Sequence, residues 1–185
     1  MGKSQTKTTA VILAAGRGSR LGELTAEMPK CLLDVGGTSI IERQVAGIKA
    51  AKSLAPIIVV TGFANKSVTD VLGTRVAECY NRGWDKANNI ASLGVAADAG
   101  WLDDSFVLFN ADVLFDIEIL EDLLACPHPC ALAVDDTKEM HEEEMKVELD
   151  DAGRIAKIAK TLDPDAAYGE YIGIAKFDKA GAAEL

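Results

Sequence analysis

Residues 13–33 (LAAGRGSRLGELTAEMPKCLL) gather the residue types that bind phosphate groups. Gly16 and Gly18 allow the backbone to turn sharply and to come close to a ligand, so that successive N–H groups can surround phosphate oxygens. Three cations stand near these glycines: Arg17, Arg20 and Lys30. The loop is therefore a candidate phosphate-binding site. A plain tight turn with surface arginines is the alternative that a G-x-G loop alone leaves open.

The same loop also allows a dinucleotide interpretation. Gly16, Gly18 and Gly22 follow a G-x-G-x-x-x-G spacing, which is close to the nicotinamide-binding fingerprint. Against this, no helical apolar stripe directly follows the glycines, and Pro29 interrupts the segment soon afterwards. The acidic residue expected at the end of the second strand is also missing, because that strand runs into residues 61–63 (TGF). A dinucleotide enzyme is therefore disfavoured.

A carboxylate, Asp112, directly follows the apolar run FVLFNA, where packing gives no reason for an acid. Mg²⁺ takes carboxylate oxygens, keeps several waters and bridges to substrate phosphates. We expect Asp112 to be a ligand of Mg²⁺. The alternative is that Asp112 caps the helix expected around Ile117.

Strand patterns alternate with helical patterns along the chain, and these elements must position the candidate residues. Continuous or alternating apolar runs predict these strands: Thr9–Ala15, Pro56–Thr61, Arg75–Tyr80, Ser105–Asn110, Ala131–Val134, Met145–Leu149 and Tyr171–Phe177. Helical spacing predicts these helices: Ser39–Ala51 with Ser39 as N-cap, Lys66–Leu72, Asn88–Ala97 and Ile117–Ala125. Residues 135–144 are highly charged and predict a solvated loop or helix.

This alternation predicts right-handed βαβ units and a mostly parallel sheet flanked by helices, an α/β fold. Ligands of such sheets bind beyond the carboxyl ends of the strands. Three of the segments named above fall at such ends: Gly16–Arg20, Gly62 and Asp112.

The composition of the chain disfavours some classes of binding partner. The 185 residues have a formal net charge of −10, which disfavours a nucleic-acid surface because neutralising phosphates requires clustered Lys and Arg. No stretch predicts a signal peptide or membrane insertion, so we expect a cytoplasmic protein. The four cysteines have no metal-binding spacing, and their thiols suit a reducing compartment. The sequence leaves the oligomeric state open, a homodimer included.

The glycines in register with Arg20, Leu21, Thr25, Pro29 and Lys30 resemble the signature of sugar-phosphate nucleotidyltransferases, which have a Rossmann-like, GT-A type fold. The resemblance extends over almost the whole chain. It implies that Arg20 engages the triphosphate, that Lys30 contacts the reacting phosphates and that Asp112 binds Mg²⁺. It also implies that the nucleotide is wrapped by these residues: Leu13, Ala14, Ala15, Gly16, Arg17 and Gly18.

The family usually supplies a second metal-binding carboxylate further toward its C-terminus. Lys179–Leu185 predicts the start of a helix, and the sequence offers no candidate for that acid. We therefore expect residues 1–185 to form a single nucleotidyltransferase domain that lacks the family's C-terminal segment.

The pattern N-(x)₆-N-N-(x)₂-S-L, which begins at Asn81, resembles the phosphocholine and 2-aminoethylphosphonate cytidylyltransferases of this superfamily. It implies CTP as the nucleotide, with Asn88 and Ser92 near the cytosine or the ribose. Capping of a helix by the asparagines is the alternative. The inositol-phosphate branch is similar but usually has Asn-Gly at this point.

The later part of the chain resembles the acceptor pocket of the cytidylyltransferase branch. Lys160 stands where related enzymes have a lysine that binds the acceptor's phosphate, and Glu170 and Tyr171 match a GE(Y/W)IG segment. Lys146 is a further candidate phosphate contact, and each lysine has a surface role as its alternative.

We expect CMP transfer from CTP to a small phosphorylated or phosphonate acceptor, with charge neutralised by Arg20, Lys30, Lys160 and Mg²⁺. A sugar-1-phosphate or inositol-phosphate nucleotidyltransferase and a non-catalytic nucleotide-binding domain are the alternatives.

Overall fold

The computed structural model describes residues 8–18, 22–23, 25–86 and 89–185. The predicted site residues Arg20 and Asn88 lie outside these ranges. The strands are β1 (Thr8–Ala14), β2 (Leu54–Thr61), β3 (Ala77–Tyr80), β4 (Phe106–Asn110), β5 (Cys130–Asp135), β6 (Lys146–Leu149), β7 (Ile155–Ala159) and β8 (Gly169–Phe177). The α-helices are α1 (Ile40–Ala50), α2 (Asn65–Leu72), α3 (Asn89–Asp98), α4 (Ile117–Ala125) and α5 (Lys179–Ala182).

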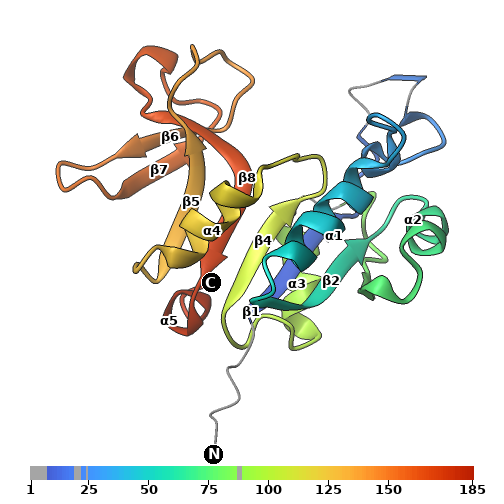
Figure 1. Cartoon of the computed structure of the whole chain (residues 1–185). Coiled ribbons are helices and arrows are strands. Elements are labelled where there is room, and N and C mark those ends of the chain that lie inside the picture. Colours follow the sequence, from blue (N-terminus) through green and yellow to red (C-terminus); the bar gives the residue numbers. More distant parts are fainter. Residues whose placement is uncertain (1–7, 19–21, 24, 87–88) are drawn as a thin grey trace, which may run out of the picture.

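The strands form one mixed sheet in the order β3-β2-β1-β4-β8-β6-β7, and β5 pairs with β8. The strands from β3 to β4 run parallel. From β4 onward the pairs are antiparallel, beginning with Phe109 opposite Ile174. The β6–β7 hairpin lies on the β8 side of the molecule, away from β2 and α2 (Figure 1).

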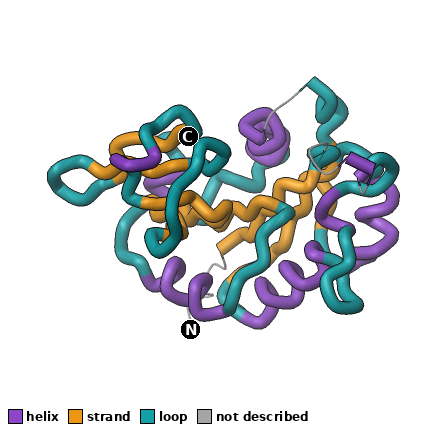
Figure 2. Tube along the Cα trace, turned by 90° about the horizontal axis from the view of Figure 1, so that it is seen from above, coloured by secondary structure: helices purple, strands orange, loops and turns teal. Residues whose placement is uncertain are grey.

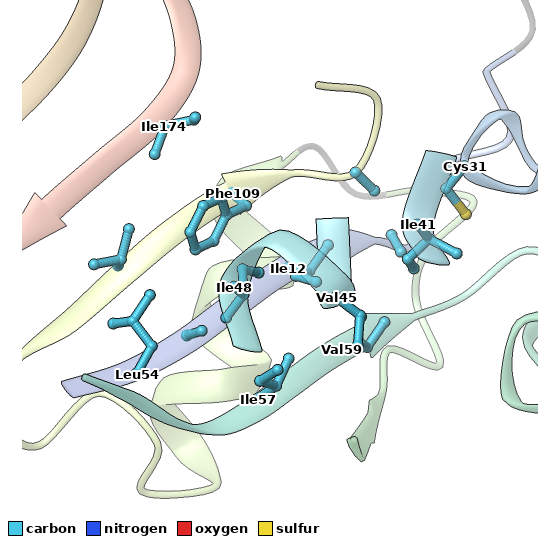
Figure 3. Packing of buried hydrophobic residues seen from close by; sticks show 14 of the residues in the cluster. Ile12, Cys31, Ile41, Val45, Ile48, Leu54, Ile57, Val59, Phe109 and Ile174 are labelled. Atoms are coloured by element: carbon cyan, nitrogen blue, oxygen red, sulfur yellow. The ribbon is translucent and has the colours of Figure 1, made fainter. Parts of the chain in front are cut away.

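Helices cover both faces of the sheet (Figure 2). Alternate residues of β1 point to opposite faces: Ile12 joins the core beneath α1, α2 and α4, whereas Val11 and Leu13 join the core beneath α3. Because both faces are buried, the central strands are continuous apolar runs. Figure 3 shows the larger core, in which Val45 and Ile48 of α1 pack over Ile12, Val59 and Phe109.

Local signals explain how α1 begins. Ser39 is its N-cap, the Ser39 side chain accepts from the Glu42 N–H, and the Glu42 side chain accepts from the Ser39 N–H. This reciprocal capping box fixes the start of the helix, and its buried residues then follow at helical spacing.

The α/β prediction is confirmed, with two differences. The short strand β7 is not among the strands predicted from the sequence, because its residues are mostly exposed and lack the run of buried apolar residues that marks the central strands. The antiparallel pairs β4–β8, β6–β8 and β6–β7 are also absent from the prediction, since periodicity identifies a strand but not its partner. In the part of the chain that the structure describes, no helix is long and apolar enough to cross a membrane.

Candidate active site

A cleft of about 590 Å³ opens where β8 leaves β4 and pairs with β6. The carboxyl ends of β1 and β4 meet there with the amino-terminal part of β8, because β8 runs antiparallel to β4. Such a change of strand direction is where α/β sheets bind ligands. We call the side formed by the ends of β1 and β4 and by Lys30 the parallel side. The antiparallel side is formed by the first residues of β8 and by the residues at the two ends of the β6–β7 hairpin.

Most of the predicted site residues line this cleft. They are Leu13, Ala14, Gly16, Gly18, Lys30, Asp112, Lys160, Glu170 and Tyr171. Their positions in the sequence range from 13 to 171, so the sheet topology and not local sequence brings them together.

Gly16 and Gly18 lack a side chain for different structural reasons. Gly18 has φ +74°, and a Cβ atom there would lie 2.9 Å from Cβ of Lys30, so a side chain would displace the lysine. A Cβ atom at Gly16 would meet nothing within 4 Å. Gly16 is therefore not required by packing, and its missing side chain leaves open space against the backbone of the cleft.

An ion pair stands at the centre of the parallel side. The Lys30 Nζ lies 2.8 Å from Asp112 Oδ2, and the two side chains are 38% and 42% exposed. Lys30 begins a short 3₁₀ helix, Lys30–Leu32, and Asp112 lies just beyond β4. Because solvent screens so exposed a pair, it adds little stability, and both groups remain accessible to a ligand. The capping alternative for Asp112 is wrong, since the N-cap residue of α4 is Asp116.

The residues around Asp112 fit Mg²⁺ only if substrate supplies further ligands. Among the described residues, no group of three or more His, Cys, Asp or Glu side chains could hold a metal ion. The Asp112 carboxylate, with the side chain of Asn110 in the same cleft, offers hard oxygen atoms. Mg²⁺ is commonly held by one or two carboxylates together with phosphate oxygens and water. The donor set therefore fits a metal that arrives with a nucleotide.

Opposite charges are paired along the antiparallel side. Lys160 Nζ lies 3.2 Å from Glu143 Oε2, and Lys138 Nζ lies 2.5 Å from Glu170 Oε2. The hydrogen bond to Glu170 raises the pKa of Lys138 above its ordinary value. Burial raises the pKa of Tyr171 to about 12, so its phenol stays neutral at physiological pH. This side thus presents both signs of charge beside a neutral aromatic ring.

The structure corrects the role of Lys146. Its side chain is fully buried, and its Nζ donates to the carbonyl oxygens of His141, Glu142 and Glu144, at 2.8, 3.1 and 3.4 Å. An ammonium group has three N–H donors, so these carbonyls use all of them. Lys146 therefore does not contact an acceptor phosphate and instead supports the loop that carries Glu143.

Ser92 also lies away from the cleft. It is 5% exposed, and its Oγ accepts from Asn81 Nδ2 at 3.1 Å, so it anchors the loop before α3 and does not line the cleft. The first residue of α3, Asn89, does line the cleft, and its Nδ2 lies 3.5 Å from Asn110 Oδ1. Asn89 is therefore an asparagine of the motif that the described structure brings to the cleft.

Arg17 and Ala15 support the loop from outside the cleft. Arg17 Nη2 donates to the Ala26 carbonyl at 2.8 Å, and its guanidinium lies 5.2 Å from the centre of the Phe63 ring. The Ala15 carbonyl accepts from the Phe63 N–H at 2.9 Å. Both residues connect the glycine loop to the residues that follow β2. The family resemblance instead implied that they contact the nucleotide directly.

One cleft residue that a nucleophilic mechanism would use is inert. Cys31 is buried beside Lys30, and burial raises its pKa to about 12. A thiol that stays protonated is a poor nucleophile. Cys31 is therefore not a candidate nucleophile in this cleft.

Sequence reasoning missed several residues of the cleft, among them Asn110, Glu143 and Met145. Asn110 could have been found, since it ends the same strand that presents Asp112. Glu143 carried no signal, because it belongs to a charged stretch and reaches the cleft only through the folding of the loop before β6.

Residues 10–164 match the model of a family described as the MobA-like NTP transferase domain. The chain is 33% identical over 129 residues to the CMP-5'-(3-aminopropyl)phosphonate synthase of Streptomyces rubellomurinus, covering 67% of this chain and 20% of that protein. It is 27% identical over 183 residues to the CTP:phosphoglutamine cytidylyltransferase of Campylobacter jejuni, covering 91% and 72%. The chain thus spans only part of the length of each relative.

A solved structure of the CTP:phosphocholine cytidylyltransferase of Streptococcus pneumoniae has the same fold. The TM-score is 0.76 at 25% sequence identity, over 96% of this chain and 73% of that one. The superposition therefore includes both sides of the cleft.

Proposed function

Because the chain belongs to the MobA-like NTP transferase domain family, we propose that it transfers CMP from CTP to a small phosphorylated or phosphonate acceptor, with release of pyrophosphate. The observation that carries this proposal is one cleft that holds the Lys30–Asp112 pair on its parallel side and Lys160 on its antiparallel side. Two cations facing one cavity suit two phosphate-bearing substrates. The similarity to cytidylyltransferases supports CTP as the donor.

The reaction is an in-line displacement at phosphorus. An oxygen of the acceptor's phosphate or phosphonate attacks the α-phosphorus of CTP, the bond to the bridging oxygen breaks, and pyrophosphate leaves with that bond's electron pair. The attacking oxygen is already ionised near neutral pH, so no general base is needed. The protein's work is to align the two substrates and to neutralise their negative charge.

On the parallel side, backbone N–H groups near Gly16 and Gly18 would surround the triphosphate, and Lys30 would stabilise charge that builds on the reacting phosphates. Asp112 would hold Mg²⁺ together with phosphate oxygens. The ion would supply further neutralisation of the phosphates. Arg20 is proposed to act in the same region, on the resemblance alone.

On the antiparallel side, Lys160 would bind the acceptor's phosphate or phosphonate. Glu143 and Glu170 place negative charge in the same part of the cleft, and Tyr171 adds an aromatic ring. Carboxylates and aromatic faces attract ammonium groups. An acceptor with an anionic phosphorus group and a cationic amine matches this arrangement, because the anion would meet Lys160 and the amine would meet the carboxylates and the ring.

The test is pyrophosphate release in the presence of Mg²⁺, with CTP, UTP, ATP or GTP paired with phosphocholine, 2-aminoethylphosphonate, an inositol phosphate or glucose-1-phosphate. Turnover with CTP and a zwitterionic acceptor is the expected result. Turnover only with a sugar or inositol phosphate would replace the proposed acceptor class. CTP binding without turnover for any pair would instead favour a nucleotide-binding domain without activity.

A further inference from the structure

One polar side chain is buried in the otherwise apolar face of α1. Gln44 is 1% exposed and lies between Ile41, Val45 and Ile48, which pack into the main core. Burial of an amide is unfavourable unless its hydrogen bonds are replaced. Its contacts should therefore reveal what the side chain does.

Gln44 donates both of its N–H groups to the segment that carries Asp112. Its Nε2 lies 2.7 Å from the carbonyl oxygen of Asn110 and 2.8 Å from that of Val113. These two carbonyls flank Asp112 on either side in the sequence. A single side chain of α1 therefore fixes both ends of the short segment beyond β4.

The rest of the segment is held from the opposite direction. The Ala111 N–H donates to the carbonyl of Leu13 at the end of β1. Gly173 of β8 has φ +89°, and a Cβ atom there would lie 2.8 Å from Asn110 Nδ2 and from Val113 Cγ2. Residues 110–113 are thus enclosed by α1, β1 and β8, while the Asp112 side chain reaches out to the cleft.

The side-chain oxygen of Gln44, Oε1, makes no such contact. It is buried and has no hydrogen-bond partner among the described residues. A buried acceptor without a partner destabilises the fold. The two donated N–H groups, and not the side-chain oxygen, therefore account for an amide at this buried position.

We propose that Gln44 is a positioning residue, which holds residues 110–113 so that the Asp112 carboxylate is presented to the cleft beside Lys30. The inference rests on the proposed nucleotidyl transfer, in which Asp112 faces the reacting phosphates. Gln44 itself does not touch substrate. Its loss should lower the rate of transfer more than the binding of CTP.

The experiment compares Gln44→Met with Val45→Ala. Methionine keeps the length of the side chain but has no N–H groups, whereas Val45 is an adjacent buried residue of α1 that gives the control for general destabilisation. For Gln44→Met we expect kcat to fall about 10- to 100-fold with the KM for CTP within about 3-fold, since a shift of about 1 Å in a reacting group has effects of this size. Val45→Ala should lower the melting temperature and leave kcat within about 2-fold.

A second readout does not depend on activity. Hydrogen exchange of the backbone amides in residues 110–116 should become faster in Gln44→Met than in Val45→Ala at matched stability. Gln44→Asn, which keeps the amide but is one methylene shorter, should be intermediate in both measurements and serves if the methionine variant does not fold.

The outcomes separate the two proposals. Equal kcat in wild type and Gln44→Met, or equal exchange of residues 110–116 in the two variants, would overturn the role of Gln44. A wild-type chain that releases no pyrophosphate with any pair would overturn the proposed function. The exchange measurement alone would then decide whether Gln44 holds the segment.

Discussion

The two sides of the cleft are built in different ways. The parallel side consists largely of backbone at the ends of β1 and β4, with open space at Gly16 and one ion pair, Lys30–Asp112. The antiparallel side consists of side chains from β8 and from both ends of the β6–β7 hairpin, held in the ion pairs Lys160–Glu143 and Lys138–Glu170.

This difference in construction indicates which side of the cleft serves the transfer reaction and which side selects the acceptor. Backbone N–H groups bind phosphate whatever the rest of the ligand is, so the parallel side suits the part of the reaction that every nucleotidyltransferase shares. Paired side chains on a hairpin can change without disturbing the central sheet. We expect substitutions on the parallel side to affect transfer itself, and those on the antiparallel side to affect the choice of acceptor.

The largest effect should follow Lys30→Ala. Loss of a cation that stabilises the transition state should reduce kcat/KM for CTP about 10²-fold or more, which is about 3 kcal/mol. Lys66→Ala is the matched control, because Lys66 forms an ion pair of similar length with Asp70 on α2, at 2.7 Å, far from the cleft. Steady-state pyrophosphate release measures both. An unchanged kcat/KM in Lys30→Ala would remove Lys30 from the site.

Lys146→Met tests whether Lys146 is correctly removed from the acceptor site. The substitution leaves three carbonyls of residues 141–144 without their donor, so the free energy of unfolding should fall by about 2 kcal/mol. Urea denaturation measures this change. A variant of normal stability with a raised KM for the acceptor would restore Lys146 to the phosphate site.

Lys160→Ala should sharpen the comparison between the two sides. We expect the KM for the acceptor to rise about 10-fold, which is about 1.4 kcal/mol, because one charge-assisted contact to the phosphorus group is lost. The KM for CTP should stay within about 2-fold. Lys157→Ala, in the exposed strand β7, is the control on the same hairpin. If both KM values rose together, the division of the cleft would fail.

Gly16→Ala should have the smallest effect. A methyl group there meets no protein atom within 4 Å but enters the space proposed for the triphosphate, so the KM for CTP should rise about 5-fold, or about 1 kcal/mol, at unchanged stability. Gly94→Ala in α3, also without a close contact, should leave that KM unchanged and stabilise the helix by about 0.5–1 kcal/mol. Equal CTP affinity in the two variants would show that the open space at Gly16 is not used.

The parallel side was largely predictable from sequence. Lys30 lines the cleft, as its resemblance to the family implied. Leu13, Ala14, Gly16, Gly18 and Asp112 line it as expected, because each lies at or just beyond the end of a strand whose apolar pattern is strong. Such residues need only the rule that parallel strands present their carboxyl ends at one edge. Lys160, Glu170 and Tyr171 also line the cleft, but their prediction came from family resemblance and not from any local pattern.

The errors share a physical cause. Lys146 and Ser92 are polar residues whose types suit a ligand, yet the fold buries both and satisfies them with protein groups. A sequence shows which hydrogen bonds a side chain can make, but not which partner lies within reach. Glu143 was missed for the same reason, since its loop is placed by the buried Lys146.

The sequence by itself predicted most of the helices and strands and a candidate phosphate-binding loop, because apolar periodicity, glycine freedom and helix capping act over a few residues. Only the tertiary structure decided the antiparallel order of β4, β8, β6 and β7 and the direction in which each polar side chain points. Those choices depend on contacts between residues far apart in the chain. Gln44 shows this most clearly, since its hydrogen bonds reach Asn110 and Val113, more than sixty positions away.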